Sequence, residues 1–225
     1  MLNNLSITAL LPMKAHSQRV RGKNFRSFAG KPLFKWILDT LLSIPYIDRI
    51  VINTDAEDIL LKNGLNPQER ILIRQRKPEI CGDFVSMNKV LEDDVKNVKS
   101  DIYLMTHTTN PLIKKETIEN ALRTFVSKYQ EGVCDSLFTV NKIQTRFYRS
   151  DASPVNHDPN NLIRTQDLEP WFEENSNLYL FTQESFFKTH ARIGKKPLLF
   201  EQNKLESVDI DDQESWDLAE LLIER

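Results

Sequence analysis

The sequence predicts an α/β fold in which helices cover both faces of a mostly parallel sheet. Apolar, strand-like runs alternate with amphipathic helical segments from residue 7 to residue 140, and this alternation is typical of parallel sheets. The 225 residues suffice for a single domain of this class. One polar segment, residues 141–175, breaks the rhythm. A loop of that length inside a compact domain is usually functional, so we expect it to protrude from the domain.

Each element is predicted from the spacing of its apolar residues and from the residues that bound it. The expected strands are residues 7–11, 49–53, 71–73, 101–105, 136–140, 178–181 and 205–210. The expected helices are residues 32–42, 55–64, 86–97, 115–129, 183–189 and 212–224. Pro32 suits a first helical turn because its φ is already helical. Asp55, Ser86 and Asp212 can each accept hydrogen bonds from the first N–H groups of a helix, and Gly64 can end one.

The composition excludes several classes of protein. No run of about 18 apolar residues is present, and the first residues lack a secretory signal pattern, so we expect a cytoplasmic protein without a membrane span. The two cysteines, Cys81 and Cys134, exclude a disulfide framework and favour a reducing compartment. The overall charge is acidic and no nucleic-acid-binding motif is present, so we expect no nucleic-acid partner.

The net charge of −2 conceals a strong asymmetry along the chain. Residues 1–38 contain seven lysines and arginines and no acidic residue, whereas residues 201–225 contain nine acidic and two basic residues. In a small α/β domain this asymmetry indicates an anion site and a metal site, although both ends could also be solvated surface.

The basic residues gather in the loop that follows the first strand. Ligands of open α/β sheets bind beyond the carboxyl ends of the strands, and the loop at 14–24 has the charge to bind a polyphosphate there. A P-loop is excluded because Pro32 follows Gly30-Lys31 where a serine or threonine is needed, and Gly22 alone cannot form a dinucleotide fingerprint. Side-chain cations must therefore neutralise the phosphates.

The acidic end contains a candidate pair of metal ligands. Asp209 and Asp211 are two residues apart, so in a strand both side chains would project from one face. Carboxylate oxygens together with phosphate oxygens suit Mg²⁺. The simpler alternative is that Asp211 or Asp212 caps the last helix, and this alternative is strongest for Asp212.

These segments together resemble the acylneuraminate (CMP-sialic acid) cytidylyltransferases. The segments that carry the resemblance are LPMKAHSQRVRGKN (11–24), AGKPL (29–33), NTD (53–55), RKPE (76–79), NPL (110–112) and VDID (208–211). They cover nearly the whole chain in the order found in that family. The segment IRTQDL (163–168) is similar to members that activate bacterial nine-carbon sugar acids such as pseudaminate and legionaminate.

The resemblance implies a Rossmann-like nucleotidyltransferase fold and a reaction in which CMP passes from CTP to an acidic α-keto sugar. It implies that Lys14, Arg19 and Lys23 hold the triphosphate, with Asp209 and Asp211 as ligands of Mg²⁺, which Mn²⁺ could replace. Further implied contacts are Ser17, Asn24, Arg76, Ser86 and His107 for the nucleotide, and Arg149, Arg164, Gln166, Asn175 and Tyr179 for the sugar. Alternatively, Tyr179 fits the core, His107 could hydrogen-bond its own loop, and Arg149 and Arg164 could be surface residues of a polar loop. The segment 141–175 would mediate a homodimer and complete the partner's sugar site.

The sequence departs from the family pattern at several positions, among them Arg21, which replaces a frequent proline and adds a charge, and Asn110, which stands where the family has serine. Lys14 stands where the family has arginine, Gln18 where it has lysine, and His107 where it often has glutamine. Lysine keeps the charge but loses the planar fork of the guanidinium. Two alternatives therefore stay open beside a nonulosonic-acid cytidylyltransferase: an enzyme for the eight-carbon acid Kdo or another sugar, and a non-catalytic nucleotide-binding module on the same fold.

Overall fold

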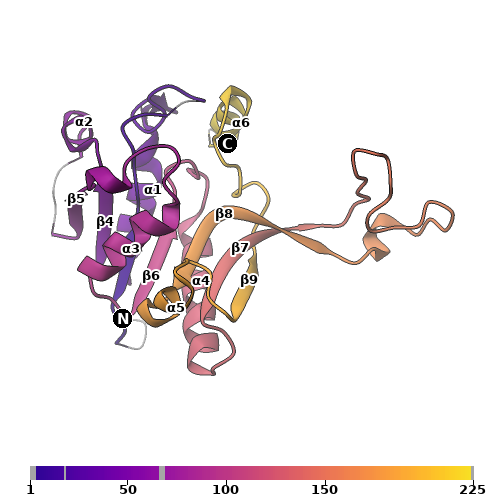
Figure 1. Cartoon of the computed structure of the whole chain (residues 1–225). Helices are drawn as coiled ribbons and strands as arrows, with labels where there is room; N and C mark the ends of the chain where they lie inside the picture. Colours follow the sequence, from indigo (N-terminus) through magenta and orange to yellow (C-terminus); the bar gives the residue numbers. More distant parts are fainter. Residues whose placement is uncertain (1–3, 18, 66–68, 224–225) are drawn as a thin grey trace.

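A seven-stranded mixed sheet forms the centre of the protein (Figure 1). The computed structural model describes residues 4–17, 19–65 and 69–223. The order of the strands in the sheet is β5-β4-β1-β6-β8-β7-β9. Their bounds are Ile7–Leu10 (β1), Arg49–Thr54 (β4), Ile71–Gln75 (β5), Ile102–Thr106 (β6), Ser136–Ile143 (β7), Trp171–Phe181 (β8) and Pro197–Glu201 (β9). Because β8 alone among these strands runs antiparallel to its neighbours, the prediction of a mostly parallel sheet is confirmed.

Helices cover both faces of the sheet, as predicted. The helices are α1 (Leu33–Leu42), α2 (Glu57–Lys62), α3 (Met87–Asn97), α4 (Lys115–Gln130), α5 (Gln183–Thr189) and α6 (Gln213–Ile223). Apolar side chains of α1, α2 and α4 pack on one face of the central strands, and those of α3 and α5 pack on the other. Each strand contributes side chains to the apolar core on both faces of the sheet, because neighbouring residues such as Ala9 and Leu10 point to opposite faces.

Three of the four predicted helix starts are confirmed. Pro32 precedes α1 as its N-cap residue. Ser86 caps α3 by accepting a hydrogen bond from the Asn88 N–H, and Asp212 accepts one from the Ser215 N–H at the start of α6. The prediction for Asp55 is wrong, because α2 follows Ala56 and its cap has no side-chain hydrogen bond.

The strand predicted at 205–210 is also wrong. Residues 203–212 form turns and irregular chain, and the last strand of the sheet is β9. Ile210 is fully buried, but instead of a strand ladder its N–H donates to the Thr109 carbonyl and its own carbonyl accepts from Lys23. β9 lies at the edge of the sheet, and its side chains alternate between exposed and half-buried. Its apolar pattern was therefore too weak to predict a strand.

A long two-stranded arm projects away from the α/β body (Figure 1). β7 and β8 pair as far out as Ile143 and Trp171, beyond the part of the sheet that the helices cover. Residues 144–170 form the tip, whose base is closed by stacking of Phe147 on Trp171, with ring centroids 5.1 Å apart. Large apolar side chains are exposed on the tip, among them Leu162 at 63% and Ile163 at 45% exposure.

None of the described helices is long and apolar enough to cross a membrane.

Candidate active site

A cavity of about 340 Å³ opens beside the loop that follows β1. Its lining consists of Lys14, Ser17, Arg19, Val20, Lys23 and Asp83. Three of the residues predicted to bind triphosphate are thus brought together at one opening, at the carboxyl end of the parallel strands. Lys14 forms an ion pair of 2.5 Å with Asp83 at the entrance. Gln18, which belongs to the same loop, lies outside the described residues.

Polar side chains, of which Asn24 and Thr108 are buried and Asp55 is exposed, hold the backbone of the loop. Asn24 donates from Nδ2 to the Lys14 carbonyl (3.0 Å) and accepts from the Thr108 hydroxyl (2.6 Å). Asp55 accepts a hydrogen bond of 2.7 Å from the Ala15 N–H. Asn24 and Asp55 thus fix the backbone of the loop, and the side chains of Lys14, Arg19 and Lys23 line the cavity.

Arg76 lies deeper and ties the loop to β4. Its Nη2 donates to the carbonyls of Met13 (3.1 Å) and Asn53 (2.8 Å), and its Nε donates to Asn53 Oδ1 (2.9 Å). The Asn53 amide in turn donates to Asp94, which also accepts from Arg74. All three hydrogen bonds of Arg76 are made with other groups of the protein. In this structure its side chain therefore links the basic loop to β4.

The acidic segment meets the basic loop at this cavity. Arg19 Nη2 lies 3.0 Å and Lys23 Nζ lies 3.5 Å from Asp211 Oδ1. Lys23 also donates to the Ile210 carbonyl. A small apolar cluster holds the two ends of the chain together beneath these ions: Val20, Phe28, Leu33, Ile210, Trp216 and Ala219. The predicted meeting of residues distant in sequence is therefore observed.

Burial changes the protonation behaviour of the central ions. Desolvation lowers the pKa of Lys23, and the nearby charges of Asp211 and Asp209 oppose that shift. Desolvation raises the pKa of Asp209, against a hydrogen bond from Thr109. Asp209 Oδ1 is buried and has no hydrogen-bond partner among the described residues, so it is an acceptor whose desolvation is uncompensated. A cation brought by a ligand would satisfy it.

Within the described residues, no group of three or more His, Cys, Asp or Glu side chains could hold a metal by itself. Asp209 and Asp211 offer two carboxylates, and a Mg²⁺ ion bound to so few protein ligands normally takes the rest from water and substrate phosphates. The buried, unpartnered oxygen of Asp209 and the hard oxygen donors of the pair fit such an ion.

Two further predicted nucleotide contacts lie along the same edge of the sheet. Ser86 is exposed at the start of α3, where its hydroxyl caps the helix. His107 follows β6 directly. Desolvation lowers the pKa of His107 to about 3, with additional repulsion from Arg192 and Lys23. The imidazole is therefore neutral, and each ring nitrogen can act in only one role, donor or acceptor.

The predicted sugar contacts are not brought together in one chain. Arg149, Arg164 and Gln166 lie exposed on the arm, and Arg164 forms a bidentate pair with Asp167 (2.7 and 3.1 Å). Asn175 is buried at the base of the arm. Its amide oxygen accepts from Thr139, and its amide nitrogen donates to Asn141 and Gln202. These hydrogen bonds hold β7, β8 and the segment after β9 together.

Sequence reasoning missed two residues beside the site. Thr108 orients Asn24, and Arg192 lies close enough to His107 to lower its pKa. Neither belongs to a recognisable motif, and the α-helices α4 and α5 and the strands β7 and β8 lie between His107 and Arg192 in the chain. Only the fold brings them to the site.

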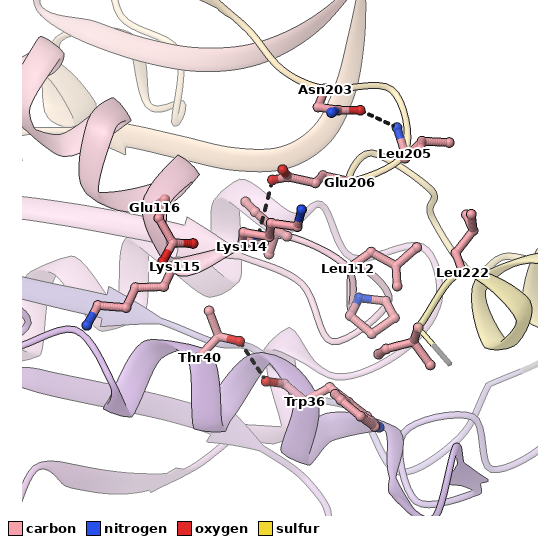
Figure 2. Close-up of a pocket in the computed structure, with 13 residues that line it drawn as sticks. Trp36, Thr40, Leu112, Lys114, Lys115, Glu116, Asn203, Leu205, Glu206 and Leu222 are labelled. Carbon is pink, nitrogen blue, oxygen red and sulfur yellow. Dashed lines mark hydrogen bonds between the residues drawn. The ribbon is translucent and has the colours of Figure 1, made fainter. Parts of the chain in front are cut away.

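A second cavity, of about 560 Å³, lies between α1, the start of α4 and α6 (Figure 2). Apolar side chains such as Trp36, Leu112 and Leu222 dominate its wall. Glu206 accepts hydrogen bonds from the Lys114 N–H (3.2 Å) and the Thr117 hydroxyl (2.6 Å). Since the N-cap residue of α4 has no side-chain hydrogen bond of its own, Glu206 caps this helix from the far end of the chain.

The family model for cytidylyltransferases matches residues 8–224. The chain belongs to the cytidylyltransferase family. The match spans both the basic loop and the acidic segment.

Several curated relatives of this cytidylyltransferase are named for N-acylneuraminate, pseudaminic acid or N,N'-diacetyllegionaminic acid. It is 26% identical to the CMP-N,N'-diacetyllegionaminic acid synthase of Legionella pneumophila, over 98% of this chain and 97% of that protein. It is 23% identical to a pseudaminic acid cytidylyltransferase of Campylobacter jejuni, over 84% and 86% of the two chains. It is 24% identical to the N-acylneuraminate cytidylyltransferase of Oncorhynchus mykiss, over 95% of this chain, but it spans only 49% of that protein.

Solved structures agree with the fold. The cytidylyltransferase superposes with a TM-score of 0.67 on the CTP complex of CMP:2-keto-3-deoxy-manno-octonic acid synthetase, at 13% identity over 97% of this chain and 98% of the other. It superposes with a TM-score of 0.70 on the 4-diphosphocytidyl-2C-methyl-D-erythritol synthase of Anaerococcus prevotii, also at 13% identity, over 100% and 98% of the two chains.

Proposed function

We propose that this cytidylyltransferase transfers CMP from CTP to the anomeric hydroxyl of a nonulosonic acid, giving a CMP-sugar and pyrophosphate. The observation that carries the proposal is the pairing of Arg19 and Lys23 with Asp211 at the mouth of the cation-lined cavity. The names of the curated relatives support an acidic nine-carbon sugar as the acceptor.

The chemistry asks this chain to position the reactants and to neutralise charge. The sugar hydroxyl oxygen forms a bond to the α-phosphorus, the bond from that phosphorus to the pyrophosphate oxygen breaks, and the hydroxyl proton is released. Lys14, Arg19 and Lys23 face the space where the triphosphate would lie. Their positive charge stabilises the negative charge that moves onto the leaving pyrophosphate.

When CTP binds, Arg19 and Lys23 would exchange their ion pairs with Asp211 for contacts with the phosphates. The side chains of Arg19 and Asp211 are 69% and 41% exposed, so they can separate at modest cost. The cations would turn to the phosphates, which would release the Asp211 carboxylate. Asp209 and Asp211 would then hold Mg²⁺, which Mn²⁺ could replace because it also takes oxygen ligands. When bound, that ion polarises the phosphate oxygens.

We also propose that the protein is a cytoplasmic homodimer. The arm exposes Leu162 and Ile163 far from the body of its own chain, and a second copy of the chain would bury them. Arg149 and Arg164 would then lie near the partner's site. Sedimentation-velocity measurements test this arrangement: a dimer is expected, and Leu162→Glu combined with Ile163→Glu should give a monomer.

A substrate panel tests the function. Purified protein is incubated with CTP, Mg²⁺ and, separately, N-acetylneuraminate, legionaminate, pseudaminate and Kdo, while pyrophosphate release and the mass of the product are followed. We expect a CMP-sugar with at least one nine-carbon acid. Product with Kdo alone would assign the enzyme to eight-carbon acids. A CTP-induced thermal shift without pyrophosphate from any acid would identify a non-catalytic nucleotide-binding protein.

A further inference from the structure

Arg192 lies at the active-site edge of the sheet, although it follows α5 in an irregular segment. Its backbone N–H donates to Asn88 Oδ1 (3.3 Å), in the first turn of α3. Its Nη1 faces the sulfur of Met105 on β6. The backbone of Arg192 is thus bound to the start of α3, and its guanidinium reaches the end of β6, within electrostatic range of His107.

The guanidinium is fixed in place by the side chains of β8. It stacks on the ring of Tyr179 at 3.8 Å from the centroid, and its Nη2 donates to the Tyr179 hydroxyl at 2.9 Å. The same nitrogen lies 3.5 Å from Glu174 Oε1. Tyr179 donates its own proton to Glu174, and burial raises the pKa of this phenol to about 12, so the hydroxyl stays protonated.

Part of the hydrogen-bonding capacity of Arg192 is unused. The side chain is only 19% exposed, yet among the described residues Nη1 faces nothing better than the Met105 sulfur, a weak acceptor, at 3.8 Å. A planar guanidinium presents N–H groups in a fork that matches a carboxylate. A largely desolvated cation with a free edge is suited to an anionic ligand.

The position of Arg192 relative to the phosphate cations is also informative. His107 is within electrostatic reach of both Lys23 and Arg192. Lys23 belongs to the phosphate cavity, whereas Arg192 stands apart from the lining of that cavity. Arg192 therefore offers a further cation near the end of β6, separate from the cations that line the phosphate cavity.

We infer that Arg192 binds the carboxylate of the acidic sugar through its Nη1 edge, and that Tyr179 and Glu174 hold the guanidinium in the orientation this requires. The inference rests on the proposed function. It assigns this task to the same chain that binds CTP. The arm residues Arg149 and Arg164, which are exposed and remote from this cavity in their own chain, would then contact other parts of the sugar.

Steady-state kinetics of Arg192→Met and Arg192→Lys test the inference, with Lys195→Met as the matched control because Lys195 is an exposed cation three residues away. A charge-assisted hydrogen bond contributes about 1.5–3 kcal/mol, so the sugar KM of Arg192→Met should rise roughly 10- to 150-fold. The CTP KM should change less than about twofold. Arg192→Lys should fall between, because lysine keeps the charge without the fork. A sugar KM that stays within twofold in Arg192→Met would overturn the inference.

A substrate change separates a carboxylate contact from a general loss of structure. The wild type should prefer the sugar acid over its carboxamide, and Arg192→Met should lose most of that preference. Retention of the full preference would refute the assignment. If Arg192→Met does not fold, Tyr179→Phe, which keeps the stacking ring, should raise the sugar KM severalfold without changing the CTP KM, and an unchanged sugar KM would count against the inference.

Calorimetric binding distinguishes failure of this inference from failure of the proposed function. If wild-type protein binds the sugar acid but releases no pyrophosphate, the proposed function fails. Loss of binding in Arg192→Met would still support the carboxylate site. If the wild type shows neither pyrophosphate release nor binding of any acid, both proposals fall.

Discussion

Arg76 provides the sharpest test of how the phosphate loop is held. Its side chain is buried, with 7% of the residue exposed, and it joins Met13 on the loop to Asn53 on β4 through three hydrogen bonds. Arg76→Lys keeps the positive charge but leaves a single nitrogen to serve acceptors that two nitrogens of the fork reach. We therefore expect the substitution to destabilise the loop.

The magnitude follows from the acceptors left behind. Each buried polar group that loses its partner costs about 1–3 kcal/mol. If lysine satisfies one of the three acceptors and water or relaxation partly satisfies another, the free energy of unfolding should fall by roughly 2–4 kcal/mol. For a domain of this size that corresponds to a decrease in Tm of about 4–16 °C.

Urea denaturation followed by tryptophan fluorescence measures this loss, with an unchanged m-value as the check that two-state behaviour is kept. Arg70→Lys is a useful comparison, since Arg70 also donates to main-chain carbonyls, those of Leu42 and Ile44, but far from the site. Arg76→Lys should lower CTP affinity as well as stability, whereas Arg70→Lys should lower stability alone. Unchanged stability together with a tenfold higher CTP KM would refute the inference that Arg76 holds the loop on β4. It would indicate instead that Arg76 contacts the nucleotide directly.

Three other predictions concern the acids of the structure. Asp211→Ala should reduce the rate of pyrophosphate release at least 100-fold while the circular dichroism spectrum is unchanged; retained activity would refute its proposed role as a metal ligand. Burial raises the pKa of Asp94 to about 6, from 3.8 in the unfolded chain, so its contribution to stability is present below pH 3.8 and is lost as the pH rises through 6. Unfolding of Asp94→Asn and wild type at pH 4.5 and 7.5 should therefore show the variant gaining relative stability at the higher pH, by about 2 kcal/mol. Glu206→Ala removes the cap of α4 and should lower the free energy of unfolding by about 1–2 kcal/mol, whereas Glu201→Ala, at an exposed position of β9, should change it by less than about 0.5 kcal/mol.

Local patterns were sufficient to predict most helices and strands, because their signals lie within a few residues. Pro32 and Ser86 mark helix starts through their own backbone geometry or hydroxyl group. The exceptions have a common cause. β9 is an edge strand that is partly exposed, so it needs no strong apolar pattern, and Ile210 is buried by Trp216 and the basic loop without a strand partner.

Some features of the candidate site could likewise be predicted from local sequence, whereas others depend on contacts between distant segments. The charges of the loop and of the acidic segment are visible in the sequence, and the structure brings Arg19 and Lys23 to Asp211 as that charge pattern suggested. The hydrogen bonds of Arg76 and Asn175 could not be predicted, because their acceptors are main-chain and side-chain groups of other strands. Whether a polar side chain faces a ligand or fastens the fold depends on its neighbours in space.

By itself, therefore, the sequence determined the class of fold and the chemical types present at the site: a cation-rich loop after the first strand and a pair of acids before the last helix. These are properties of short segments. Only the tertiary structure decided which cations face the phosphate cavity, that Arg149 and Arg164 lie away from it on the arm, and that Arg192 lies within electrostatic range of His107. Parallel strands joined through helices place residues distant in the chain at one edge of the sheet, and no local pattern records which of them will meet.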